Sequence, residues 1–414
     1  MRLKIKKIGH RTFASLKIRN YRLYFFGQAV SLCGTWMQTI GQTWLVLKMT
    51  NSGTQLGLIA AAQFLPMLFF APFGGIVADR FNKRKILYFT QTASAILALI
   101  LGILVATASV QLWMVYVLAV LLGCVNTIDN PTRQTFIFEM VGKDSLQNAV
   151  SLNSTQVNLA RVIGPAIGGG IIAGLGLAPC FFINAVSFLS VLIALFMMTA
   201  EELSPAPISE HKKGQLREGF RYVKSNKTLR ETLLMMAIIG TLTYEFAVSL
   251  PLLAQFTFHG NAGTYAALTV AMGLGSMAGG LYSASRKKIK TGMLVNAAWL
   301  FGATTLLLAI APSFILALAA LVLVGFFSIS FLSTGNTTLQ LESEPGMRGR
   351  VMSLWTMAFL GSTPIGGPIV GFIGEHAGPR WGLVLGGVAA LVAAGIGAWQ
   401  MIKTKKQIQP HDAN

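Results

Sequence analysis

Four charged residues lie inside stretches of the chain that are otherwise apolar. They are Asp129, Arg133 and Arg161 in the first half and Glu245 in the second half. A charge near the centre of a bilayer costs about 2.5–3.5 kcal/mol even on the lenient insertion scale, so such residues face a protein interior or a watery cavity. The chemistry open to them is ion pairing, binding of a charged solute, or the carriage of protons by a carboxyl group.

The two embedded acids differ in their basic neighbours. Asp129 has two candidate partners, Arg133 at i+4 and Arg161, and an adjacent cation favours the ionised carboxylate. For Asp129, a structural ion pair and a role in proton coupling remain equal alternatives. Glu245 has no basic residue in its segment beyond Arg230, and loss of water favours the protonated form. Glu245 is therefore the leading candidate for proton coupling; the alternative is a carboxyl group neutralised by structural hydrogen bonds.

The whole chain has the composition of a polytopic membrane protein. It has 414 residues, of which 53% are hydrophobic and only 11% charged, and its mean hydropathy is +0.61. A soluble domain carries about 25% charged residues, whereas a membrane-spanning helix needs about 20 mainly apolar residues. The sequence predicts an all-α membrane protein with twelve transmembrane helices, near 22–47, 55–78, 86–107, 112–137, 148–175, 179–199, 230–257, 263–284, 291–311, 313–338, 349–374 and 380–402.

Two weak internal repeats suggest that the chain is a duplication. The pattern at 130–134 (NPTRQ) recurs at 336–340 (NTTLQ), and the pattern at 164–168 (GPAIG) recurs loosely at 367–371 (GPIVG). Both shifts are close to half the chain length, which is typical of transporters built from two related bundles. We expect an N-terminal six-helix bundle at 1–199, a cytoplasmic linker at 200–229, and a C-terminal six-helix bundle at 230–414. Leu216, Phe220 and Val223 share one face of an amphipathic surface helix predicted within the linker.

The first predicted helix carries a polar seam at intervals of three and four residues. Such spacing places side chains on one helical face, and lipid would not tolerate so many amides. We expect the seam to line a cavity, although hydrogen bonds between helices are the common alternative. The seam consists of Gln28, Ser31, Thr35, Gln38 and Gln42. We place Asn158, Arg161 and Tyr244 on the same substrate path.

The loop after the second predicted helix reads GIVADRFNKRK at 75–85. It resembles the GxxxDRxGRK signature of the major facilitator superfamily, with Asn82 at the usual second glycine. Asparagine tolerates a left-handed backbone, so we expect the turn to survive. The resemblance implies a conformational latch made of Gly75, Asp79, Arg80 and Arg84, in which Asp79 meets the start of the eleventh helix near 350–353.

The fifth predicted helix contains a motif that is similar to the GPxxGG pattern of superfamily exporters. Its residues are Gly164, Pro165, Gly168 and Gly169. The wider stretch from 130 to 170 resembles the exporter branch that includes the enterobactin exporter and macrolide efflux proteins. The resemblance implies the superfamily fold of two pseudo-symmetric six-helix bundles, and it favours efflux over import.

Other function classes have little support in the sequence. Cys33, Cys124 and Cys180 show no CxxC spacing, and the five histidines fall in predicted loops or tails, so we expect no metal site and no cofactor. No nucleophile–base arrangement suggests an enzyme. The net charge of +19 could suggest nucleic acid, but the basic residues gather in alternate short loops. Four acids, Glu139, Asp144, Glu342 and Glu344, are expected in solvated loops.

These observations predict a transporter that exports a small amphipathic molecule, such as a drug, a macrolide or a siderophore, by alternating access. The expected partners are this substrate, protons as an antiported ion, and the lipid bilayer, with the protein acting as a monomer in a bacterial inner membrane. A proton-coupled importer or facilitator of a metabolite is the first alternative. A lipid flippase, which lipid stimulation without drug resistance would favour, is the second.

The basic residues predict the orientation. Loops and tails on one side carry 28 lysines and arginines, and those on the other side carry only Lys48 and Arg380. Because basic residues collect on the cytoplasmic side, both termini and the 200–229 linker should be cytoplasmic. In a background without native cysteines, Lys212→Cys should resist a membrane-impermeant thiol reagent in intact cells and react after lysis. Labelling in intact cells would contradict this topology.

Overall fold

A computed structural model describes residues 13–204, 215–286, 292–344, 346–359 and 361–408. Within these ranges every regular element is a helix. The described chain divides into two compact units, one built from residues up to 45 and from 65 to 204, the other from residues 46–64 and from 215 onward. The predicted all-α class is confirmed.

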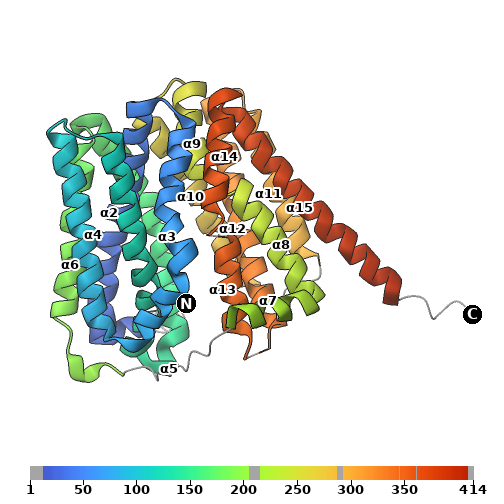
Figure 1. Ribbon diagram of the computed structural model, residues 1–414, viewed down its shortest axis with the longest axis horizontal. Coiled ribbons are helices and arrows are strands. Elements are labelled where there is room, and N and C mark those ends of the chain that lie inside the picture. Colours follow the sequence, from blue (N-terminus) through green and yellow to red (C-terminus); the bar gives the residue numbers. More distant parts are fainter. Residues whose placement is uncertain (1–12, 205–214, 287–291, 345, 360, 409–414) are drawn as a thin grey trace, which may run out of the picture. The chain divides into compact units, whose positions relative to one another are not determined.

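The first unit is built from the long helices of the first half of the chain, apart from residues 46–64, which belong to the second unit (Figure 1). The segments that the sequence places at 112–137 and 148–175 form two helices that meet at Gly142, whose backbone (φ 65°, ψ −175°) is not helical; both carry the label α5. Two 3-10 turns, η1 (Ala14–Lys17) and η2 (Ala200–Glu202), flank the unit. The helices are α2 (Arg19–Thr50), α3 (Gly53–Arg80), α4 (Lys83–Ala106), α5 (Leu112–Leu175) and α6 (Ala178–Phe196).

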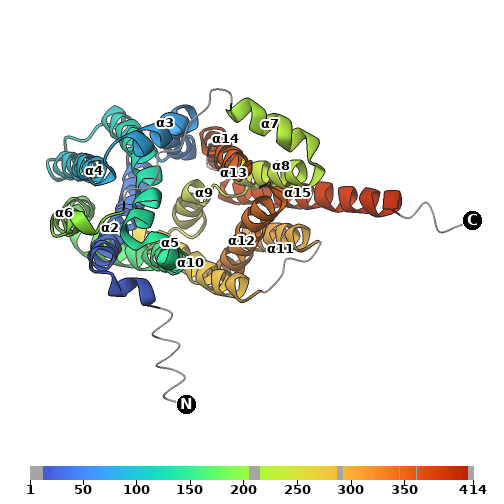
Figure 2. The ribbon, with the colours of Figure 1, turned by 90° about the horizontal axis from the view of Figure 1, so that it is seen from below.

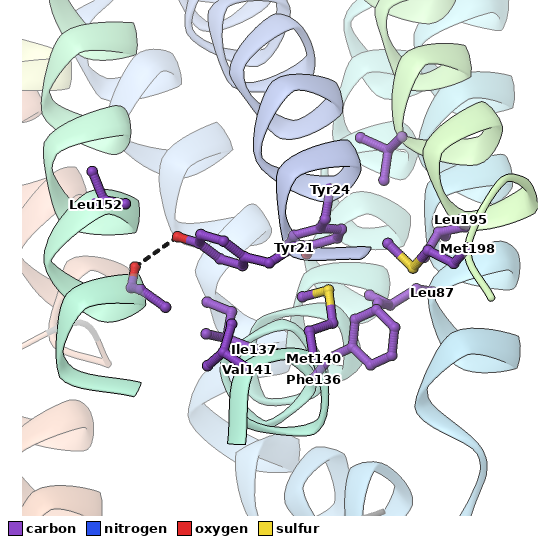
Figure 3. Close-up of a cluster of buried hydrophobic side chains, with 12 residues drawn as sticks. Tyr21, Tyr24, Leu87, Phe136, Ile137, Met140, Val141, Leu152, Leu195 and Met198 are labelled. Carbon is purple, nitrogen blue, oxygen red and sulfur yellow. Dashed lines mark hydrogen bonds between the residues drawn. The ribbon is translucent and has the colours of Figure 1, made fainter. Parts of the chain in front are cut away.

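A buried apolar cluster joins α2, α4, α5 and α6 at one end of this unit (Figure 3). Tyr21 and Tyr24 enter it from α2, and the ring of Tyr24 meets Phe136 edge to face at 5.8 Å. The Tyr21 hydroxyl donates to the Ala149 carbonyl at 2.8 Å, beyond the kink of α5. The cluster thus ties both sides of the kink to the first helix.

Glu139 corrects one expectation from the sequence. We expected it in a solvated loop, but it is buried and accepts a hydrogen bond from Lys83 Nζ at 2.7 Å. The backbone carbonyl of Glu139 also accepts from Ser204 N at 2.9 Å. Because α5 continues past 137, Glu139 lies on a helix packed against α4, where a buried carboxylate requires a partner.

The second unit contains two predicted segments that are broken rather than continuous (Figure 2). The segment expected at 230–257 forms α8, α9 and the π-helical turn η3, and the segment expected at 349–374 forms α13 and α14. The elements are α7 (Gln215–Ser225), α8 (Lys227–Leu242), α9 (Phe246–Leu252), η3 (Leu253–Thr257), α10 (Ala262–Ser285), α11 (Met293–Ala309), α12 (Phe314–Glu342), α13 (Arg348–Phe359), α14 (Thr363–His376) and α15 (Pro379–Ile408).

The start of α3 packs in the second unit, backbone against backbone on α14. A Cβ atom added to Gly57 would lie 2.1 Å from the Gly367 carbonyl oxygen, and one added to Gly371 would lie 2.1 Å from the Gly53 carbonyl oxygen. Only glycine permits this approach, as in small-residue crossings of membrane helices. Glu375 Oε2 then accepts hydrogen bonds from Ser52 Oγ at 2.6 Å and Thr54 N at 2.9 Å, which caps α3.

Eight helical stretches of the described chain are long and apolar enough to cross a membrane. They include α4, α5, α6, α12 and the broken pairs α8–η3 and α13–α14. Their lengths agree with a multi-pass membrane protein, and the count of twelve spans stays a prediction.

The glycine crossing gives a stability prediction. Gly57→Ala should force α3 away from α14 and lower the free energy of unfolding by about 1–3 kcal/mol, the usual cost of overpacking. Gly170→Ala is the matched control, since a Cβ at Gly170 meets nothing within 4 Å. Thermal unfolding of the purified protein in detergent should show a lower midpoint for Gly57→Ala only. Equal midpoints for the two variants would mean that the close crossing is not formed.

Candidate functional site

Asp129 lies on α5 with every carboxylate oxygen engaged. Its side chain is buried, and Oδ1 accepts hydrogen bonds from Thr90 Oγ1 at 2.6 Å and Gln91 Nε2 at 2.9 Å. Oδ2 lies 2.7 Å from Arg133 Nε, one helical turn away. The sequence left the ion pair open between two arginines, and the structure places Arg133 in it. Thr90 and Gln91 were missed, although adjacent polar residues within the apolar segment 86–107 are a signal of a buried polar network.

Arg161 lies on the second helix of α5, after Gly142, and against an aromatic ring. Its guanidinium carbon is 4.9 Å from the centroid of the Trp36 ring on α2. A cation over an indole face gains about 0.5–2 kcal/mol, more when water is excluded. Trp36 is a neighbour that the sequence did not predict, because the contact joins two helices 125 residues apart.

The GPxxGG residues form the close contact between α5 and α2. All four are buried, and a Cβ at Gly164 would lie 2.6 Å from the Cys33 carbonyl oxygen and 2.6 Å from Trp36 Cβ. Gly168 faces Met37 in the same way, at 3.0 Å from its Cγ. Pro165 and Gly169 complete the buried set. The motif therefore positions Trp36, and Trp36 lies against Arg161.

The polar seam of α2 is divided between two environments. Gln28 and Gln38 are buried, and Gln38 Oε1 accepts a hydrogen bond from Asn184 Nδ2 of α6 at 2.6 Å. Thr35 is exposed and donates to its own helix at Ser31 O. Gln42 is half-buried, as is Asn158, whose amide donates to Ser154 O. Gln38 thus makes a hydrogen bond between α2 and α6, whereas Thr35 is exposed on the surface of the first unit.

The signature loop between α3 and α4 is built differently from the expectation at one position. Asn82 has an extended backbone, with φ of −62° and ψ of 114°, and its side chain accepts from Lys85 N at 3.1 Å as the cap of α4. No left-handed residue is needed there because α3 ends and α4 begins within two residues. Asp79 and Gly75 are half-buried, Arg80 is exposed, and Arg84 donates to the Phe196 carbonyl at 3.3 Å.

Glu245 occupies the break between α8 and α9. It is 3% exposed and is the residue before the first turn of α9. A Cβ at Gly366 of α14 would lie 3.0 Å from Glu245 Oε1, and one at Gly367 would lie 3.6 Å from Oε2. Thr363 interacts with the carboxyl group, whereas Oε1 has no hydrogen-bond partner among the described residues. Two glycines thus make room for a carboxyl group that is only partly satisfied.

Backbone and aromatic contacts hold this break in place. The amides of Thr243 and Tyr244 both donate to Ile239 O, and Thr243 Oγ1 donates to Gly386 O of α15 at 2.7 Å. The Tyr244 ring lies 4.8 Å from the ring of Phe359. It also lies 5.6 Å from Phe301, with the planes tilted toward an edge-to-face contact. The break is therefore a packed feature that places Glu245 in the interior of the second unit.

Among the residues that the structure describes, no three His, Cys, Asp or Glu side chains come together to hold a metal ion. Asp129 and Glu245, the two embedded acids singled out from the sequence, lie in contrasting surroundings, each in a different unit. Asp129 is held by an arginine and two donors, while Glu245 has an unsatisfied oxygen. The two acids therefore differ in how fully the described residues satisfy their oxygens.

Known proteins match nearly the whole chain. The family model described as transmembrane secretion effector matches residues 10–413. The Staphyloferrin A transporter of Staphylococcus aureus is 26% identical, covering 83% of this chain and 87% of its own. The multidrug efflux pump Tap of Mycolicibacterium fortuitum is 26% identical, with 86% and 90% covered. The enterobactin exporter EntS of Escherichia coli is 25% identical, with 91% and 88% covered.

Solved structures share the fold at lower identity. A bacterial homologue of the human lysosomal transporter Spinster, in an inward-facing and unoccupied conformation, aligns with a TM-score of 0.73 at 16% identity, covering 92% of this chain and 96% of its own. The nucleoside transporter NupG aligns with a TM-score of 0.66 at 16% identity, with 95% and 99% covered.

The resemblance drawn from the signature loop and the GPxxGG motif is confirmed. The chain belongs to the transmembrane secretion effector family, a family of multi-pass membrane transporters, not enzymes, in the major facilitator superfamily.

Proposed function

We propose that this protein exports a small amphipathic molecule across a bacterial inner membrane by alternating access, driven by proton antiport through Glu245. Relatives named as a siderophore transporter, a siderophore exporter and a multidrug efflux pump support export of a siderophore-like or drug-like molecule. The observation that carries the coupling proposal is the partly satisfied carboxyl group of Glu245, buried at a helix break.

The location of Glu245 explains why a proton there could affect the helices. When the carboxyl group is charged and buried, its unsatisfied oxygen carries a large desolvation cost; when it is protonated, that cost falls. The group lies against Gly366 and Gly367, where α14 begins, and it is the residue before α9. Gain or loss of the proton therefore changes the energy of packing α9 against α14. Substrate export in exchange for protons needs this kind of link between charge and helix packing.

Asp129 has a different proposed role. Its side chain contacts Arg133, Thr90 and Gln91. We assign it to holding α4 and α5 together. The substrate path in the first unit would then run past Thr35, Gln42, Asn158 and Arg161, which keep exposed surface on α2 and α5. Tyr244 is proposed to face the path in the second unit.

Orientation, latch and oligomeric state complete the proposal. Both termini would be cytoplasmic, and the protein would act as a monomer. Asp79, with Gly75, Arg80 and Arg84, would form a latch with the region 350–353 when the inner side closes. A helix start attracts a carboxylate by about 0.3–1 kcal/mol, and α13 begins at Arg348.

Replacement of Glu245 tests the coupling. Glu245→Gln keeps the size and an acceptor oxygen but cannot exchange a proton. Uphill export in inverted vesicles with an imposed pH gradient should be abolished, while substrate affinity measured on purified protein should stay within about three-fold, a change of under about 0.7 kcal/mol. Substrate-induced proton release in proteoliposomes is the direct readout. Release with the wild-type stoichiometry from Glu245→Gln would refute the assignment.

Asp129→Asn serves as the matched comparison, since it also removes one embedded carboxylate. It leaves the buried side of Arg133 without its counter-charge, and breaking a buried ion pair costs about 3–5 kcal/mol. The expected result is less folded protein in the membrane, with proton release per transported substrate unchanged in the fraction that folds. Loss of proton release with normal folding would transfer the coupling role to Asp129.

The latch gives a further prediction. Asp79→Asn should remove the attraction to the helix start and slow transport by about two- to five-fold, in line with 0.3–1 kcal/mol. Expression and thermal stability should be normal. The measurement is the initial rate of substrate transport in vesicles, with Asp144→Asn, an exposed acid on α5, as the control. Identical rates for Asp79→Asn and wild type would count against the latch.

A further inference from the structure

The short helix α7 lies at the end of a membrane-crossing segment. It ends at Ser225, and Asn226 caps α8 by accepting from Leu229 N at 3.2 Å. The stretch Lys227–Thr257 is long and apolar enough to span a bilayer. Figure 1 shows α7 running across the lower ends of α8 and α13. This position puts α7 at the level where a membrane meets water.

One side of α7 is fixed to the second unit. Val223 is buried, and a Cβ at Gly219 would lie 3.2 Å from Arg350 Cβ of α13. Glu218 Oε1 lies 2.8 Å from Arg350 Nη1. The Tyr222 hydroxyl accepts from Glu344 N at 3.1 Å. These contacts set the rotation of α7 about its own axis, and therefore which residues face outward.

The exposed side of α7, which we call the α7 outer face, consists of Arg217, Phe220, Arg221 and Lys224. All four are exposed, and their spacing of i, i+3, i+4 and i+7 places them on one stripe. Phe220 is 59% exposed although it is a large apolar ring. The one acid of α7, Glu218, is engaged with Arg350. The outer face therefore carries three cations around a phenylalanine and no counter-charge of its own.

We propose that the α7 outer face binds the head groups of anionic phospholipids, with Phe220 inserted at the boundary between head groups and acyl chains. Basic residues next to a bilayer attract anionic lipid, each by roughly five-fold in surface affinity, and aromatic rings of amphipathic helices enter this boundary. A solvated linker would leave Phe220 in water with no gain. This interaction adds to the proposed export and does not depend on its substrate or its coupling ion.

The same contacts connect lipid binding at α7 to the position of α13. Arg350 is held by Glu218, and Gly219 packs on Arg350 and Leu354. A lipid surface that orders α7 therefore also holds the first turns of α13, the region that the proposed latch would engage. We infer that anionic lipid accelerates transport through α7, while neutral lipid does not.

The first test reads the position of α7 without any transport assay. The full-length protein, free of native cysteines, carries a nitroxide label at Phe220→Cys and is reconstituted in nanodiscs of phosphatidylcholine with or without phosphatidylglycerol. The measurement is how often the label collides with oxygen, which dissolves in lipid, and with a nickel complex that stays in water. Collisions with oxygen should exceed those with the nickel complex only when phosphatidylglycerol is present. Arg217→Gln, Arg221→Gln and Lys224→Gln together should return the label to water.

A matched control removes three charges from another basic segment. Lys287→Gln, Lys288→Gln and Lys290→Gln together should leave the label at the lipid boundary. A label in water in both lipids, or one unaffected by the α7 charges, would overturn the proposal. So would a label shielded from both collision partners in both lipids, since that would indicate a protein surface packed on α7.

The second test measures transport. Phosphatidylglycerol should raise the wild-type rate by about three-fold or more, and the triple α7 variant should lose this stimulation while the control variant keeps it. Equal stimulation of both variants would refute the proposed connection between lipid at α7 and α13. If the protein proves not to export the chosen molecule, the label experiment still decides whether α7 binds anionic lipid.

Discussion

The cost of placing a carboxyl group among apolar helices constrains the rest of this structure. In the first unit Arg133, Thr90 and Gln91 offset this cost by surrounding Asp129 with one opposite charge and two donors. The same solution recurs at Glu139, which pairs with Lys83. In the second unit, Glu245 has Thr363 and an unsatisfied oxygen instead. A buried acid with an unsatisfied oxygen is a candidate for proton exchange, because a purely structural acid normally has hydrogen-bond partners for both carboxyl oxygens.

Glycine provides the second constraint, because it decides where helices can approach closely. Gly164 and Gly168 bring α5 onto α2, and Gly366 and Gly367 bring α14 to the break that holds Glu245. Gly164, Gly168 and Gly367 come from the loosely repeated motif at 164–168 and 367–371, and Gly366 directly precedes that motif. The repeat is thus a repeat of close helix contacts, and the functional groups beside them differ: an arginine and a tryptophan in the first unit, a glutamate in the second. The crossing of Gly53 and Gly57 with α14 follows the same principle.

Much of the fold follows from the sequence because apolar length and basic loops are strong signals. The starts and ends of α4, α10 and α12 lie within a few residues of the predicted ranges. The signature loop and the GPxxGG motif gave the superfamily. The breaks at 243–245 and between Phe359 and Thr363 were not predicted, because an apolar stretch reads the same whether or not its helical hydrogen bonds continue. Glu139 was misplaced because the first helix of α5 continues past the predicted end at 137, up to the kink at Gly142. The left-handed backbone predicted for Asn82 is wrong, because asparagine is favoured both in left-handed turns and at the N-caps of helices, and here it caps α4. Partners such as Thr90 and Trp36 depend on the packing of distant helices, which one sequence does not specify.

The central claim is that Glu245 exchanges a proton when substrate binds. Infrared difference spectroscopy of the reconstituted protein, recorded before and after substrate addition, observes the carboxyl group itself. Proton antiport through Glu245 predicts that substrate removes a protonated-carboxyl band from the wild-type spectrum, and that this signal is missing from Glu245→Gln but present in Asp129→Asn. The same band change in Glu245→Gln and in the wild type would contradict the account.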